Sequence, residues 1–128
     1  MIVLQTNQLT KSFGVNEVLK GVTLTVQDHH RVGLVGSNGS GKSTLLKILA
    51  GVLSDYDGAV TIDGHAPGVA TKQIVSYLPD ADFLNPEWTA ADAIRIYSTF
   101  FADFDADKAA SMVDFFGLPT DRRLGEMS

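Results

Sequence analysis

Residues 36–44 have the residue types and the spacing that bind the phosphates of a nucleotide. The segment fits the P-loop pattern G-x-x-x-x-G-K-[ST] in full, and it consists of Gly36, Ser37, Asn38, Gly39, Ser40, Gly41, Lys42, Ser43 and Thr44. Its glycines let the backbone fold round an anion with no Cβ in the way, so that successive N–H groups point inward. We therefore predict a nucleoside triphosphate site in this segment, which we call the P-loop.

Three side chains at the end of the motif have distinct expected roles. Lys42 would reach the β- and γ-phosphates as a point charge, and Ser43 would offer its hydroxyl to Mg²⁺. Thr44 would contact the α-phosphate. The predicted ligand is thus a nucleoside triphosphate with its magnesium ion.

The residues on either side of the P-loop predict the order of strand, loop and helix. The apolar run at 32–35 predicts a strand before it, and residues 45–50 predict a helix after it that ends at Gly51. A chance glycine-rich turn is the competing interpretation, and this context disfavours it.

The rest of the chain divides into a strand-rich front and a helical back. Strands are predicted at 2–9, 18–26, 59–62 and 74–78, with a turn at 11–14. From about residue 88 the apolar residues recur at helical spacing instead. A capping box at 89–92 begins one helix, and a second helix starts after Asp105 and stops at Gly117 and Pro119.

Composition limits what a chain of 128 residues with 45% apolar content can be. It fits one domain core, or part of one, and the lack of cysteine excludes disulfides and thiolate metal sites. The net charge of −5 is concentrated in residues 80–128, which hold ten acidic and four basic residues. This acidity argues against nucleic-acid binding, and neither a signal peptide nor a membrane-inserted segment is expected.

The order of these pieces resembles the nucleotide-binding subunit of ATP-binding cassette (ABC) transporters along the whole chain. Besides the P-loop, the resemblance rests on 7–14 as opening strand and adenine loop, 18–22 as the segment after it, 75–80 as the Q-loop, and 124–128 as the approach to the signature sequence. It implies an α/β P-loop NTPase cassette core with an antiparallel β subdomain and the start of an α-helical subdomain. The nucleotide core would span 1–79 and the truncated helical subdomain 80–128.

Two further site residues follow from the resemblance. Phe13 would stack its ring on adenine, and the competing interpretation is that it only packs a turn. Asp80 stands where the family has the glutamine of its Q-loop. It is either a Mg²⁺-side contact or a turn residue after Pro79, and both interpretations stay open.

The resemblance also implies a function. The intact protein would bind ATP and Mg²⁺ and hydrolyse ATP to drive export through a transmembrane permease, with two like or unlike cassettes sharing the nucleotide. Residues 77–80 and 102–105 look like an exporter-type branch. The expected location is cytoplasmic, on the inner face of the cell membrane and attached through the permease.

The motif at the end of the chain limits the catalysis that we expect. The signature resemblance stops at its serine, Ser128, and the family places its hydrolytic residues later. We therefore assign no catalytic residue and expect these residues to bind Mg-ATP far better than they cleave it. A parallel sheet with an open edge, prone to self-association, is also expected.

Two alternatives from other classes stay open. Residues 28–36 also resemble a branch of soluble ABC ATPases that act on the ribosome. A stand-alone, non-catalytic nucleotide-binding module is the other alternative.

Overall fold

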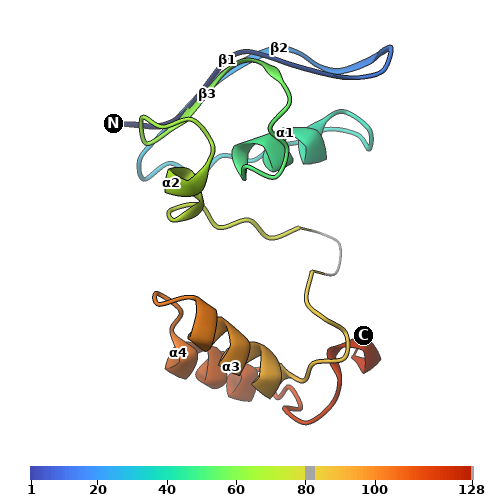
Figure 1. Cartoon of the computed structure of the whole chain (residues 1–128), viewed down its shortest axis with the longest axis vertical. Helices are drawn as coiled ribbons and strands as arrows, with labels where there is room; N and C mark the ends of the chain where they lie inside the picture. Colours follow the sequence, from blue (N-terminus) through green and yellow to red (C-terminus); the bar gives the residue numbers. More distant parts are fainter. Residues whose placement is uncertain (80–82, 128) are drawn as a thin grey trace. The chain divides into compact units, whose positions relative to one another are not determined.

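The computed structural model describes residues 1–79 and 83–127. These residues belong to two compact units, with the bounds Met1–Leu78 and Pro79–Ser128. The first unit is built on a sheet and the second on helices (Figure 1).

The first unit contains a three-stranded antiparallel sheet. Its strands are β1 (Ile2–Phe13), β2 (Asn16–Gln27) and β3 (Asp57–Ile62), in the order β2-β1-β3. The strands predicted at 2–9, 18–26 and 59–62 are confirmed. The turn predicted at 11–14 is wrong for its first three residues, because Phe13 pairs with Asn16 and the hairpin turns only at Gly14 and Val15.

The pairing of β1 with β2 is interrupted by bulges, and threonine hydroxyls replace the lost ladder bonds. Thr6 is 0% exposed, and its Oγ1 donates to the Val22 carbonyl at 3.0 Å and accepts from the Leu24 N–H at 3.1 Å. The Thr10 hydroxyl likewise accepts from the Gly21 N–H at 3.1 Å. These side chains keep partly buried backbone groups paired where the register shifts.

Helix α1 (Lys42–Leu49) packs its apolar face on this sheet. The buried core comprises two helix residues and three strand residues, namely Leu45, Ile48, Leu9, Leu19 and Val60. The short helix α2 (Val69–Lys72) follows β3. The sheet thus forms the support on which the start of α1, and with it the P-loop, is fixed (Figure 1).

Two predicted strands are wrong. Residues 32–35 and 74–78 do not form strands, and Val35 and Leu78 are exposed. Their apolar composition suits a buried parallel strand, but a strand exists only when another strand pairs with it. Neither segment has a ladder partner among residues 1–79 and 83–127, and the expected parallel sheet is correspondingly absent from them.

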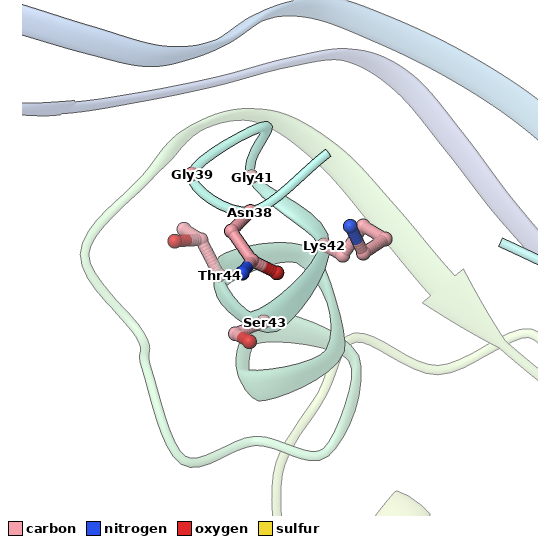
Figure 2. Close-up of a pocket in the computed structure, with 6 residues that line it drawn as sticks. All are labelled: Asn38, Gly39, Gly41, Lys42, Ser43 and Thr44. Atoms are coloured by element: carbon pink, nitrogen blue, oxygen red, sulfur yellow. The ribbon is translucent and has the colours of Figure 1, made fainter. Parts of the chain in front are cut away.

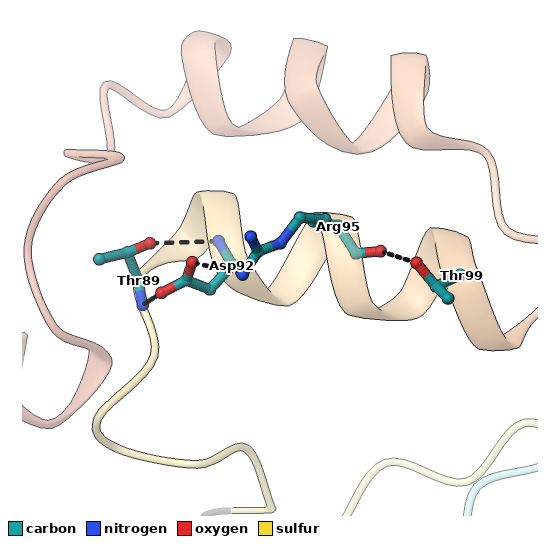
Figure 3. Close-up of polar contacts among 4 residues, drawn as sticks. All are labelled: Thr89, Asp92, Arg95 and Thr99. Carbon is teal, nitrogen blue, oxygen red and sulfur yellow. Dashed lines mark hydrogen bonds and ion pairs between the residues drawn. The ribbon is translucent and has the colours of Figure 1, made fainter.

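The second unit is a pair of helices followed by a returning segment. Its elements are α3 (Ala90–Phe100), α4 (Ala106–Phe115) and the 3₁₀ turn η1 (Leu124–Glu126). Both predicted helices are confirmed, and both are capped by side chains. The Thr89 Oγ1 accepts from the Asp92 N–H at 3.1 Å (Figure 3), and the Asp105 Oδ1 accepts from the Lys108 N–H at 2.9 Å.

The returning segment runs along the residues that precede α3. The Leu124 N–H donates to the Trp88 carbonyl at 2.7 Å, and the Gly125 N–H donates to the Pro86 carbonyl at 2.9 Å. A Cβ on Gly125 would lie 2.9 Å from the Pro86 Cβ, so glycine is required for this approach. No helix in the described part of the chain is long and apolar enough to cross a membrane.

Candidate functional site

The P-loop leads directly into α1 through a glycine in the left-handed region, a conformation that favours glycine over other residues. Gly41 is the N-cap of α1 and has φ 99° and ψ 4°. Upstream of it, the Ser40 N–H closes a turn on the Ser37 carbonyl at 3.2 Å. Gly39 also has a positive φ, 84°, so the chain reverses sharply before the helix begins.

The first turn of α1 presents backbone donors that the protein does not use. The first helical hydrogen bond runs from the Leu45 N–H to the Gly41 carbonyl at 2.9 Å, and α1 has no side-chain cap. Within the described ranges, the N–H groups of Lys42, Ser43 and Thr44 therefore have no acceptor. Unlike the capped helices α3 and α4, α1 has first-turn amides and a positive dipole end free for an anion.

The three residues that carry these donors line a pocket of about 290 Å³. It is lined by residues of the P-loop, namely Asn38, Gly39, Gly41, Lys42, Ser43 and Thr44 (Figure 2). Ligand pockets usually measure about 300–1,000 Å³, so this one has room for a phosphate chain rather than for a whole nucleotide. A base and sugar would lie outside it.

The Lys42 ammonium is bound by the loop itself in this structure. Its Nζ donates to the Gly36 carbonyl, to the Ser37 carbonyl at 2.9 Å and to the Ser40 Oγ at 3.4 Å. In Figure 2 the Lys42 side chain extends away from the Ser43 and Thr44 hydroxyls. An anion that enters the pocket would compete with these carbonyls for the ammonium.

The P-loop glycines are also required for packing. A Cβ on Gly36 would lie 2.6 Å from the Ser40 Oγ. A Cβ on Gly41 would lie 3.0 Å from the Leu19 Cδ2 and 3.1 Å from the Val18 carbonyl oxygen. The loop is therefore held close to β2 at Gly41, and a larger residue at position 36 would require the Ser40 side chain to move.

Phe13 is not among the pocket-lining residues. It ends β1 and is 49% exposed, and the Lys11 Nζ lies 4.9 Å from the centroid of its ring. Lys11 was not singled out by the sequence, because a lysine in a predicted turn is ordinarily solvated. The structure instead places it in β1 with 8% of its surface exposed.

The residues of the pocket could hold a metal ion only if a bound phosphate supplied further ligands to it. Ser43 contributes one exposed hydroxyl to the pocket. The residues described here contain no group of three or more acidic or histidine side chains that could hold an ion by themselves. Mg²⁺ commonly binds through one or two protein ligands together with substrate phosphates and water, and Ser43 suits that mode. Asp80, the other predicted metal contact, lies outside the described residues.

The loop, the uncapped helix start and the antiparallel sheet beside them define a P-loop nucleotide-binding cassette. A family model described as ABC transporter matches residues 19–128. The chain belongs to the ABC transporter family.

Individual relatives agree with this assignment. The chain is 39% identical to the ribose import ATP-binding protein RbsA of Yersinia pestis over 75% of its length, which covers 20% of RbsA. It is 32% identical to the cytochrome c biogenesis ATP-binding export protein CcmA of Nitrobacter winogradskyi over 68% of its length, which covers 44% of CcmA. The chain thus spans less than half the length of these relatives, which include an import and an export protein.

A solved structure shows the same fold. The structure of an ATP-binding subunit of an ABC transporter superposes with a TM-score of 0.79 over 98% of this chain and 56% of its own, at 24% sequence identity. The cassette fold with an antiparallel β subdomain, expected from the sequence, is therefore confirmed.

Proposed function

We infer that this chain binds Mg-ATP and is the nucleotide-binding part of an ATP-hydrolysing transporter subunit. The observation that carries the proposal is the start of α1, where three partnerless amides, a lysine and a serine meet at one phosphate-sized pocket. Lys42 would exchange its loop carbonyls for the β- and γ-phosphates. Ser43 would ligate Mg²⁺, and Thr44 would contact the α-phosphate.

The base would bind outside this pocket. A ring that is half exposed at the end of β1 supports the proposal that Phe13 stacks on adenine. At the Q-loop position we retain Asp80 as a Mg²⁺-side contact. The two units would correspond to a nucleotide core at 1–79 and a helical subdomain at 80–128.

Hydrolysis would need groups that the pocket lining does not supply. The residues that line the pocket offer backbone N–H groups, one side-chain amide, one lysine ammonium and two hydroxyls. None of them is an acidic residue or a histidine. A clamp on the phosphates without a group that orients water favours binding over turnover. These residues by themselves would therefore bind ATP far better than they cleave it.

In the whole protein, ATP would be shared between two cassettes that act on a permease from the cytoplasmic side of the membrane. The second unit exposes several large aromatic side chains, Phe100, Phe101, Phe115 and Phe116. Phe115 and Phe116 contact each other, with ring centroids 5.2 Å apart, and contiguous exposed apolar groups are typical of surfaces that contact another protein. This supports a contact between the second unit and the permease.

Export is the direction of transport that we propose, on the resemblance of residues 77–80 and 102–105 to an exporter-type branch. The permease would select the transported compound. ATP added to inside-out vesicles that contain the whole transporter would drive accumulation of the compound by an exporter, and would not do so for an importer.

Calorimetric titration with Mg-ATP tests the nucleotide site. Lys42→Ala should weaken binding by about tenfold or more, because a charge-assisted contact to phosphate is lost. Lys47→Ala is the matched control, since it removes the same charge from an exposed position in the last turn of α1. Equal affinities for wild type and Lys42→Ala would refute the proposed site.

A further inference from the structure

Lys11 is a charged residue that is buried in the hairpin. The residue is 8% exposed, and lysines are rarely buried unless an opposite charge pairs with them. Its acidic partner is Asp55, whose Oδ2 lies 3.5 Å from the Lys11 Nζ and whose side chain is fully exposed. An ion pair with a fully solvated carboxylate is weak, so it does not by itself account for the burial of this side chain.

The second neighbour of this ammonium is an aromatic ring. The Lys11 Nζ lies over the Phe13 ring, 4.9 Å from its centroid. This is inside the distance of about 6 Å at which a cation is attracted to the face of a ring. Phe13 is 49% exposed, and because the cation covers one face, the opposite face is the one on which a flat ligand can stack.

The hairpin register links Lys11 to the P-loop through one residue of the neighbouring strand. Lys11 pairs with Leu19 across β1 and β2. Leu19 in turn lies against the P-loop, since its Cδ2 would be 3.0 Å from a Cβ on Gly41, which lines the pocket. Lys11 is therefore one strand away from the P-loop. The base of a nucleotide bound at the P-loop would lie outside the phosphate pocket.

We propose that Lys11 is a positioning residue that holds the Phe13 ring ready to stack on a purine base. The proposal rests on the proposed function, because it assumes that a nucleotide triphosphate occupies the P-loop. A cation on one face withdraws π density from the ring and so lowers the repulsion that a second ring meets on the other face. It also restricts the ring to one orientation, which reduces the ordering cost of binding.

The test compares two ligands that share the triphosphate and differ in the base. Affinities for Mg-ATP and for magnesium tripolyphosphate are measured by calorimetry for the wild type, Lys11→Met, Lys11→Arg and Phe13→Ala. Lys11→Met should lower the affinity for Mg-ATP by about threefold to tenfold and leave the affinity for magnesium tripolyphosphate unchanged. Phe13→Ala should do the same, and Lys11→Arg, which keeps a cation over the ring, should restore ATP affinity.

Lys20→Met is the matched control, because it removes an exposed cation from the neighbouring strand. An equal loss of ATP affinity in Lys20→Met and Lys11→Met would assign the effect to general charge and overturn the proposal. Equal losses for both ligands in Lys11→Met, or no loss in Phe13→Ala, would overturn it as well. A wild type that binds neither ligand would instead refute the proposed function itself.

Discussion

Leu19 of β2 lies directly against Gly41 of the P-loop, so that a Cβ on Gly41 would come within 3.0 Å of the Leu19 Cδ2. Leu19 is also a core residue, packed with Leu45 and Ile48 of α1. One contact therefore joins the hairpin, the helix and the loop between them. The position of the P-loop depends on the absence of a side chain at residue 41.

Gly41→Ala should destabilise the protein and weaken Mg-ATP binding. Alanine at φ 99° is strained, and its Cβ would overlap Leu19, so we expect a loss of about 2 kcal/mol or more in the free energy of unfolding. Gly39→Ala is the control: its φ of 84° is also strained, but a Cβ there meets no atom within 4 Å. Urea unfolding should show a loss of about 1 kcal/mol in the free energy of unfolding of Gly39→Ala. Equal losses in both variants would show that the Leu19 contact contributes nothing.

Ser43→Ala should weaken ATP binding only when magnesium is present. The Ser43 hydroxyl is the expected protein ligand of the ion, and its loss should lower the affinity for Mg-ATP by about fivefold. In EDTA the two proteins should bind ATP equally. Thr44→Ala, which would remove a phosphate contact, should weaken binding with and without the ion. The role of Ser43 is refuted if its substitution has the same effect in EDTA as in magnesium.

Thr6→Val should destabilise the sheet although it preserves the shape of the side chain. The buried Thr6 hydroxyl is hydrogen-bonded to the Val22 carbonyl and the Leu24 N–H, and valine would leave both without that partner. Unsatisfied buried groups cost about 1–3 kcal/mol, and urea unfolding measures the loss. Thr6→Ser keeps the hydroxyl and should lose less of the free energy of unfolding than Thr6→Val. If serine is the more damaging replacement, the methyl group matters more than the bridge.

Asp92 should stabilise α3 in a pH-dependent way. The pKa of the Asp92 carboxyl lies below its ordinary value of 3.8. The main cause is the hydrogen bond from the Thr89 backbone N–H, followed by a hydrogen bond with the Thr89 side chain and by the nearby Arg95 guanidinium. Because the folded pKa lies below the unfolded one, the stabilisation is present well above the unfolded pKa and is lost as the pH falls through the folded pKa. The stability difference between wild type and Asp92→Asn should therefore be constant from about pH 5 to 7 and shrink below 3.8.

Denaturant unfolding at several pH values checks this prediction. Asp92→Glu keeps a carboxylate at the same position of the capping box and should retain the pH dependence. A difference between wild type and Asp92→Asn that stays constant down to the lowest pH would contradict the role of the ionised carboxylate.

Several parts of the site could be predicted from the sequence because they depend on neighbouring residues. The P-loop pattern specifies a turn, its glycines and the helix that follows, and α1 begins at Lys42 as the motif requires. The caps at Thr89 and Asp105 are equally local, since each bonds an N–H three residues away. The segments 32–35 and 74–78 were mispredicted because apolar composition indicates a buried strand but does not provide its partner.

The sequence by itself determined a phosphate-binding loop at residues 36–44, the cassette resemblance and the helical back of the chain. Only the tertiary structure decided that β1 continues through Lys11 to Phe13, that Thr6 bridges a bulge, and that Leu19 holds Gly41 in place. The physical reason is the range of the interactions. Turns and caps form between residues a few positions apart, whereas the burial of Lys11 and the packing of the P-loop depend on contacts between residues distant in the chain.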